Sequence, residues 1–265
     1  MRPVHTSASD VLLMEEIEAG LMVLTFNRPE VMNALNRDLT HALSDAFRAV
    51  SEDSNVQALI LRGQGGNFMA GGDIHLFCEA LELPAIERRD YFYQLVGYVN
   101  DLMRLLVEMP KPIITCVEGV AAGFGVSLAL QADNVLVHPK ANFTMAYNQM
   151  GLSPDGGASY ILPRAVGVVR ARGLFAGSTN LSAHQAHDFG LVTDVVENTF
   201  EHAKKAAHSL MALPQEALVQ TRALLLDKEA FYQHLEHERQ AFATCVATDA
   251  FAQRVHGFLN KRKTS

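Results

Sequence analysis

Short hydrophobic runs and helix-like patterns alternate along most of the chain. Residues 11–16 and 21–26 are β-like runs joined by Glu18-Ala19-Gly20, which predicts a β-hairpin. After Asn33 the apolar residues recur every three or four positions, at Leu35, Leu39, Leu43, Phe47 and Val50. This spacing puts them on one face of an amphipathic helix.

The same alternation continues further along the chain. Strands are expected at residues 56–61, 112–117, 134–137 and 192–196, with a helix at 124–131. Residues 79–108 are rich in charged and aromatic side chains, and we interpret them as a helical cap or insertion. Strands that alternate with helices predict an α/β domain with a largely parallel or spirally wound sheet.

Beyond residue 199 the pattern is helical only. Helices are expected at residues 200–211, 215–226, 231–246 and 249–260, separated by a few residues each. We therefore divide the chain into an α/β core, residues 1–199, and a helical C-terminal region, residues 200–265. The apolar faces of these helices must be covered by the core or by another subunit, which favours an oligomer.

Composition excludes several classes of protein. With 265 residues, 49% of them hydrophobic, the chain is long enough to bury a sizeable core. The net charge of −7 argues against a nucleic-acid surface, which needs clustered cations. The one basic run, Lys261-Arg262-Lys263, reads on its own as a solvated tail. No apolar run approaches membrane-spanning length, and the N-terminus lacks the apolar core of a signal peptide.

Cysteine and histidine spacing points away from disulfides and metals. Cys78, Cys116 and Cys245 are too widely separated for a metal-binding pair and too few for a disulfide framework, so a reducing cytoplasmic location is expected. His184 and His187 share a helical spacing, but they follow a sequence typical of a helix start, and we expect no metal site.

Two glycine-containing turns carry the candidate chemistry. Phe68-Met69-Ala70-Gly71-Gly72-Asp73 and Gly119-Val120-Ala121-Ala122-Gly123-Phe124-Gly125 each follow an expected strand and lead into an expected helix. Such turns can expose backbone N–H groups toward an anion, and two of them together would form an oxyanion hole. The plainer alternative is a pair of tight βα turns. Neither turn is a GxGxxG or GxxxxGK[ST] motif, so nucleotide binding has little support.

Ordered motifs along nearly the whole chain resemble the crotonase, or enoyl-CoA hydratase/isomerase, family. They are Asn27-Arg28-Pro29 with Asn33-Ala34-Leu35, residues 68–74, Lys111-Pro112 leading to Gly119–Gly123, Gly151-Leu152-Ser153-Pro154-Asp155-Gly156-Gly157, and Gly190-Leu191-Val192. The resemblance implies a spiral of ββα units, a helical region that forms trimers or dimers of trimers, and a CoA thioester substrate with no further cofactor.

The resemblance also implies functions for individual residues. The oxyanion donors fall on the backbone amides of Ala70 and Phe124, the latter in place of a more usual glycine, and one such donor is typically worth roughly 3 kcal/mol. The CoA end of the site would involve Arg28, Ala34, Ala70, Gly71, Gly72 and Asp73, with Phe258 and Lys261 reaching the nucleotide. Tyr147 would line the acyl pocket.

Departures from the family pattern narrow the reaction. The positions of the two glutamates of the hydratases are occupied by Ser127 and Tyr147, which are poor general bases at neutral pH. Asp155 remains as the acidic candidate. It resembles the base of enoyl-CoA isomerases, including the ring-opening isomerase of phenylacetate degradation, and a single carboxylate suffices to move a double bond. A helix N-cap is its structural alternative.

Two further readings stay open at this point. Asp155 is also similar in position to the aspartate nucleophile of 4-chlorobenzoyl-CoA dehalogenases, and the loss of both glutamates is compatible with a non-catalytic acyl-CoA-binding trimer. Enoyl-CoA isomerisation is the preferred prediction, with hydration as the activity that the family label suggests.

Overall fold

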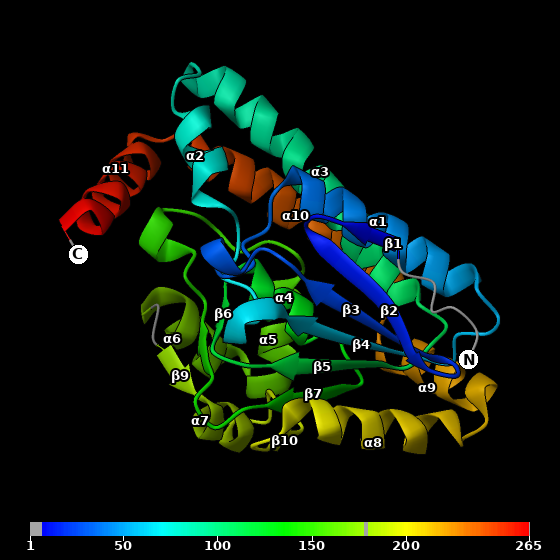
Figure 1. Cartoon of the computed structure of the whole chain (residues 1–265). Helices are drawn as coiled ribbons and strands as arrows, with labels where there is room; N and C mark the ends of the chain where they lie inside the picture. The colour runs from blue at the N-terminus through cyan, green and yellow to red at the C-terminus, as the bar shows by residue number, and fades with distance from the viewer. Residues whose placement is uncertain (1–6, 178–179, 265) are drawn as a thin grey trace.

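The computed structural model describes residues 7–177 and 180–264 and is built on one mixed main sheet (Figure 1). Its strands lie in the order β1-β2-β3-β4-β5-β7-β10. The first two pairs are antiparallel, and every pair from β3 onward is parallel. The strands are β1 (Ser7–Ser9), β2 (Leu12–Glu18), β3 (Leu21–Phe26), β4 (Ala58–Gly63), β5 (Ile113–Val117), β7 (Asn134–Val137) and β10 (Asp194–Val195).

Both faces of the parallel part of this sheet are buried, and β3 illustrates how. Leu21 and Val23 point to one face, where they pack with Ala203 and Ala207 of α8 (Thr199–Met211). Leu24 belongs to the larger core on the other face. There α1 (Arg37–Glu52), α3 (Ala85–Glu108) and α10 (Lys228–Val246) cover the sheet, opposite α8 in Figure 1. A parallel strand buried on both faces needs the near-continuous apolar sequence that β3 has.

A second, small sheet positions the glycine-rich turn that follows β5. It contains β6 (Val120–Ala122), β8 (Asn142–Thr144) and β9 (Asn180–Ser182), with β6 parallel to β8. Its strands are too short to give an alternating pattern in sequence, and they were not predicted. The chain passes from β6 through Gly123 into α4 (Phe124–Ala129).

The remaining elements surround these sheets. They are η1 (Pro29–Val31), η2 (Gln64–Gly66), α2 (Ile74–Ala80), η3 (Asn148–Met150), α5 (Ala158–Val166), α6 (Val168–Gly177), α7 (Ala183–Asp188), α9 (Gln215–Leu225) and α11 (Asp249–Thr264). Helix α11 begins beside α2 and η3 and extends away from the sheet, as Figure 1 shows at the C-terminus.

The C-terminal helices share the main core with the α/β part of the chain. Phe231, Leu235 and Phe242 of α10 belong to the same buried cluster as Leu59 of the sheet. The boundary after residue 199 therefore falls at the first residue of α8 and does not separate two cores. The α/β fold with a helical C-terminal region is confirmed, and the helical reading of residues 79–108 corresponds to α3.

Candidate active site

The two glycine-containing turns lie side by side. The Met69 N–H donates to Val120 O at 3.0 Å, and the Ala122 N–H donates to Met69 O at 2.9 Å. Gly71 has a φ of +87°, and a Cβ added there would lie 3.0 Å from Ala122 O. Glycine is needed at this point both for the backbone conformation and for the close approach of the two turns. The convergence expected from the sequence is present.

The prediction that Ala70 supplies an oxyanion donor is wrong. Its N–H donates to Met32 O at 3.0 Å and is not directed at a ligand. Gly72 is the better donor. Leu35 N–H donates to Gly71 O, and Asp73 N–H donates to Leu35 O, so the intervening Gly72 N–H faces the opposite side. Within residues 7–177 and 180–264, the Gly72 N–H has no hydrogen-bond acceptor.

The Phe124 N–H is free among the described residues, as an oxyanion donor must be, and its catalytic role stays a prediction. Phe124 is the first residue of α4, where the N–H has no intrahelical acceptor, and no acceptor for it occurs in the described part of the chain. The preceding Gly123, with a φ of +50°, turns the chain into the helix. The side chain of Phe124 is buried, and a Cβ on Gly156 would lie 2.7 Å from its ring.

Two adjacent cavities meet at these groups. One, of about 90 Å³, is bordered by Ala70, Gly71 and Tyr147. The other, of about 40 Å³, is strongly apolar and runs between α2, α3 and the start of α1. Gly72, Phe124 and Asp155 border both cavities. The residues that carry the two free amides and the Asp155 carboxyl group therefore border the same space.

Asp155 is held by Tyr147 and Ser127, the two residues predicted to replace the hydratase glutamates. The Tyr147 hydroxyl lies 3.0 Å from Asp155 Oδ1, and the Ser127 hydroxyl donates to Asp155 O at 3.0 Å. Ser127 Oγ and Tyr147 Oη are 3.2 Å apart. All three residues are buried, and sequence positions 127, 147 and 155 are thus brought together as one polar cluster in an otherwise apolar wall.

The environment shifts the pKa values of this cluster. Burial, and then the negative charge of Glu238, raise the pKa of Asp155 to about 7, although the hydrogen bond from Tyr147 acts in the opposite direction. Burial and the adjacent Asp155 charge raise the pKa of Tyr147 well above 10. Tyr147 is therefore a neutral donor, and Asp155 can both release and accept a proton near neutral pH.

Glu238 was not predicted from the sequence to belong to the site. It lies on α10, in a run of mixed charges that reads as a solvated helix face, yet only 4% of it is exposed. Its carboxylate accepts from Gly157 N–H at 2.7 Å, Ser159 N–H at 2.8 Å and the Ser159 hydroxyl at 2.5 Å. The hydroxyl also lies 2.8 Å from His234 Nε2. The apolar residues Phe231, Leu235 and Phe242 recur along α10 at a spacing that places position 238 on the same helix face. This spacing is the signal that could have indicated the burial of Glu238.

Arg28 and Asp73, both predicted to contact CoA, pair with each other. Arg28 Nη2 lies 2.7 Å from Asp73 Oδ2, and Arg28 also donates to Ala34 O. Asp73 Oδ1 caps α2 by accepting from the His75 N–H at 3.0 Å. These contacts join the loop after β3 to the first glycine-containing turn and hold the Ala34 segment in place. Contact of Arg28, Ala34 or Asp73 with CoA stays a prediction.

Two C-terminal residues, Phe258 and Lys261, were assigned to the nucleotide of CoA. Phe258 is on α11 and is 42% exposed. The side chain of Lys261 lies outside the described part of the chain. Their proposed contact with CoA therefore stays a prediction as well.

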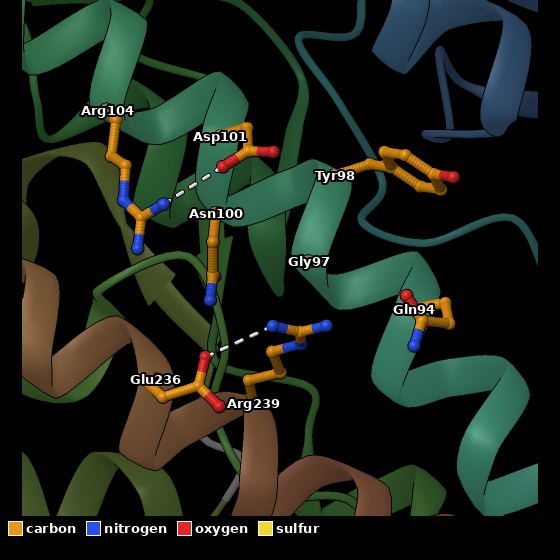
Figure 2. Close-up of a pocket in the computed structure, with 8 residues that line it drawn as sticks. All are labelled: Gln94, Gly97, Tyr98, Asn100, Asp101, Arg104, Glu236 and Arg239. Atoms are coloured by element: carbon orange, nitrogen blue, oxygen red, sulfur yellow. Dashed lines mark hydrogen bonds and ion pairs between the residues drawn. The ribbon is translucent and has the colours of Figure 1, made fainter.

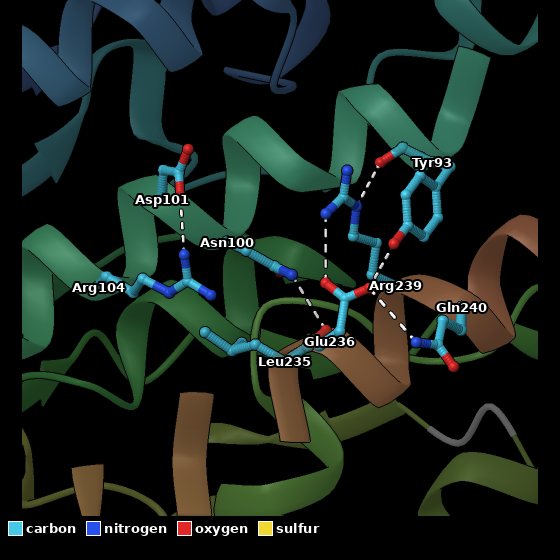
Figure 3. A network of polar contacts seen from close by, with 8 residues as sticks. All are labelled: Tyr93, Asn100, Asp101, Arg104, Leu235, Glu236, Arg239 and Gln240. Carbon is cyan, nitrogen blue, oxygen red and sulfur yellow. Dashed lines mark hydrogen bonds and ion pairs between the residues drawn. The ribbon is translucent and has the colours of Figure 1, made fainter. Parts of the chain in front are cut away.

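A separate polar cavity of about 130 Å³ lies between α3 and α10 and is not part of this site (Figure 2). Its charges are largely paired, with Arg239 3.2 Å from Glu236 and Arg104 3.0 Å from Asp101. In Figure 3 the Tyr93 hydroxyl donates to Glu236, and the Asn100 side-chain amide donates to Leu235 O. These hydrogen bonds connect α3 with α10. No group predicted from the sequence to act in catalysis borders this cavity.

The described part of the chain lacks both a candidate metal site and a candidate membrane-spanning helix. No cluster of His, Cys, Asp and Glu side chains there could hold a metal ion. Among the same residues, none of the helices has the length and apolar character needed to cross a membrane.

Comparisons with known proteins agree with the geometry. The Enoyl-CoA hydratase/isomerase family model matches residues 16–265. The 1,2-epoxyphenylacetyl-CoA isomerase of Escherichia coli strain K12 is 35% identical over 236 residues, covering 84% of this chain and 89% of that protein. The crotonyl-CoA hydratase of Syntrophomonas wolfei subsp. wolfei is 33% identical over 256 residues, covering 94% of this chain and 95% of that protein. The solved structure of Pseudomonas aeruginosa OdaA aligns with a TM-score of 0.84 at 30% identity, covering 95% of this chain and 99% of that chain.

Proposed function

Because the chain belongs to the enoyl-CoA hydratase/isomerase, or crotonase, family, we propose that it is an acyl-CoA enzyme that moves a double bond along an enoyl-CoA. The single observation that carries the proposal is the position of Asp155. Its carboxyl group borders the same cavities as the free amides of Gly72 and Phe124 and has a pKa of about 7.

The proposed reaction needs only these three groups. The Asp155 carboxylate takes a proton from C2 of a 3-enoyl thioester, and the electron pair moves through the carbonyl to give a dienolate. The Gly72 and Phe124 N–H groups donate to the thioester oxygen, which carries the new negative charge. Protonated Asp155 then returns the proton at C4, leaving a 2-enoyl thioester and a regenerated carboxylate. Atoms and charge balance without any other reactant.

Hydration is the second candidate and has weaker support. It needs a group that activates water in addition to one that protonates the α-carbon. Among the described residues that border the two cavities, Asp155 is the one carboxylate. The high pKa of Tyr147 keeps its hydroxyl protonated, so it cannot serve as a base near neutral pH. The 33% identity to a crotonyl-CoA hydratase is the observation in favour of hydration.

The proposal extends to the CoA end of the substrate and to assembly. Arg28 and Ala34 of the loop after β3, together with Gly71 and Asp73 of the first glycine-containing turn, are proposed to contact CoA. Phe258 and Lys261 are proposed to reach its nucleotide. Leu224 and Leu225 on α9 are 87% and 81% exposed, which supports burial against other subunits in a homotrimer or a dimer of trimers. Light scattering after gel filtration should give a mass of three or six chains.

Separate incubation with 3-enoyl-CoA and 2-enoyl-CoA tests the reaction. We expect conversion of the 3-enoyl to the 2-enoyl ester and little hydration of the latter. Asp155→Asn should lower turnover by at least about a thousandfold, because it removes the group that transfers the proton, while acyl-CoA still binds. Efficient hydration without a double-bond shift would reject isomerisation. Binding without turnover of any acyl-CoA would favour a non-catalytic protein.

A further inference from the structure

We propose that Glu238 is a positioning residue for Asp155, acting from α10 through the turn that joins Asp155 to α5. The inference rests on the proposed function, since it assumes that Asp155 transfers the proton. Glu238 does not border either active-site cavity, and it follows Asp155 by more than eighty residues in the chain.

The hydrogen bonds of Glu238 fix this turn at two points. Its Oε2 accepts from the Gly157 N–H, and its Oε1 accepts from the N–H and hydroxyl of Ser159. Gly157 precedes α5 with a φ of +83° and offers no side chain to cap the helix, so Glu238 supplies the cap from another element. Asp155 lies two residues before Gly157. Moving the turn would move the Asp155 carboxyl group relative to the Gly72 and Phe124 amides.

The three donors also favour a negative charge on Glu238. A carboxylate can accept from all of them, whereas the amide of glutamine would place its own N–H groups against one of the donors. Burial opposes this charge and raises the pKa of Glu238, while the three hydrogen bonds lower it. The resulting charge is one of the two causes that raise the pKa of Asp155, after burial.

The titratable groups around Glu238 leave its charge largely uncompensated. Asp155 and Tyr147 interact with it from the cavity side. His234 faces it through the Ser159 hydroxyl, but burial, His237 and Arg164 lower the pKa of His234 below 6.5. His234 is therefore mostly neutral at pH 7 and above, and its Nε2–H can donate to Ser159 while Ser159 donates to Glu238. Among the described residues no cation forms an ion pair with Glu238, so its charge acts on Asp155 without such a partner.

Glu238→Gln tests both roles of the residue. We expect kcat on a 3-enoyl-CoA to fall by about tenfold with KM nearly unchanged, because the proton-transfer geometry is disturbed and substrate contacts are not. The midpoint of the kcat/KM profile against pH should move about one unit lower, because a negative charge near Asp155 is lost. A Glu238 with a merely structural role would not move that midpoint.

Glu236→Gln is the matched control. Glu236 lies on the same helix, carries the same charge and accepts from the Tyr93 hydroxyl at 2.5 Å, but it faces the polar cavity of Figure 2. We expect it to leave both kcat and the pH midpoint unchanged. Glu238→Asp keeps the charge with a shorter reach, so its midpoint should stay near that of the wild type while kcat falls.

Distinct results overturn the inference and the proposed function. A wild-type kcat and midpoint in Glu238→Gln, or an equal shift in Glu236→Gln, would overturn the role of Glu238 while leaving Asp155 as the base. Full activity in Asp155→Asn would overturn the proposed function itself. If Glu238→Gln does not fold, Glu238→Asp decides the matter: a lowered kcat at wild-type KM supports the inference, and a wild-type kcat overturns it.

Discussion

The hydroxyl of Tyr147 lies 3.0 Å from Oδ1 of Asp155, and this contact favours the ionised form of a carboxyl group that is the one carboxylate among the described residues bordering the two cavities. Tyr147 remains protonated, so it stabilises the Asp155 anion by donating to it. Burial and Glu238 act in the opposite direction. The balance leaves a base that is ionised to a useful fraction at neutral pH and is still strong enough to take a proton from carbon.

Tyr147→Phe removes the donor and keeps the ring. The pKa of Asp155 should rise, because its anion loses a hydrogen bond, and the midpoint of kcat/KM against pH should move to higher pH. At pH 7 the rate should fall by about threefold to tenfold, and much of it should return at pH 9. The measurement is initial-rate isomerisation of a 3-enoyl-CoA across pH 5 to 9.

Tyr93→Phe is the control for this change. It removes a tyrosine hydroxyl that donates to the Glu236 carboxylate where α3 contacts α10 (Figure 3). Neither residue borders the two cavities that Asp155 borders. Its pH profile should match that of the wild type. A Tyr147→Phe profile that moved to lower pH, or did not move, would show that Asp155 is not the group that titrates in the rate.

Much of this site was predictable because the chemistry lies in local motifs. The turns at residues 68–73 and 119–125 combine glycines with strand-to-helix transitions, and the structure places them in contact. The predicted donor, Ala70, lies two residues before Gly72, whose N–H is free among the described residues. Which N–H is free depends on the pairing of that turn with Leu35, a long-range register that residue types do not specify.

Asp155→Asn should change the pH dependence of stability. The pKa of Asp155 is about 7 in the folded protein and near 3.8 when unfolded, so the folded state binds more protons between these values. Stability therefore falls as pH rises from about 4 to 7, by on the order of 4 kcal/mol for this group. The asparagine variant has no carboxyl group at this position and lacks that loss of stability. Its thermal unfolding midpoint should therefore exceed that of the wild type at pH 8 and approach it at pH 4.

Asp45→Asn provides the comparison, because Asp45 is an exposed carboxylate on α1. Its difference in thermal midpoint from the wild type should stay small and nearly constant from pH 4 to 8. If the Asp155→Asn difference were equally flat, the carboxyl group would not carry a raised pKa in the folded protein.

The contribution of Glu238 to the site could not be predicted from the sequence. Its helix carries several acids and histidines, and burial of one glutamate among them follows from how α10 packs on α5 and α3. Asp155 could be predicted to be a base from its motif. The effect of the Glu238 charge on the pKa of Asp155 could not be predicted in this way. Tertiary packing, which a local pattern does not encode, supplies the second cause of the raised Asp155 pKa.

Asp73→Ala should destabilise the loop next to the cavity. Arg28 and Asp73 form an ion pair in which the side chains are only 14% and 4% exposed, and Asp73 also caps α2. Removing one partner leaves a mostly buried guanidinium uncompensated, so we expect a loss of about 3 kcal/mol in the free energy of unfolding. Asp45→Ala breaks the exposed pair with Arg48 and should cost less than about 1 kcal/mol. Urea denaturation of the two variants compares them, and equal losses would contradict a structural role for the buried pair.

Phe124→Leu should change acyl selectivity while keeping the backbone donor. The Phe124 ring borders both cavities and packs against Gly156, so a smaller side chain enlarges the space beside Asp155. Relative to the wild type, kcat/KM for 3-decenoyl-CoA over 3-hexenoyl-CoA should rise by about tenfold, the effect expected of one to two methylene groups in an apolar pocket. Phe47→Leu, a buried change on α1 that does not border the cavities, should lower stability without altering this ratio. An unchanged ratio in Phe124→Leu would mean that the acyl chain leaves Asp155 in another direction, and a changed ratio in Phe47→Leu would mean that selectivity reflects general loosening of the core.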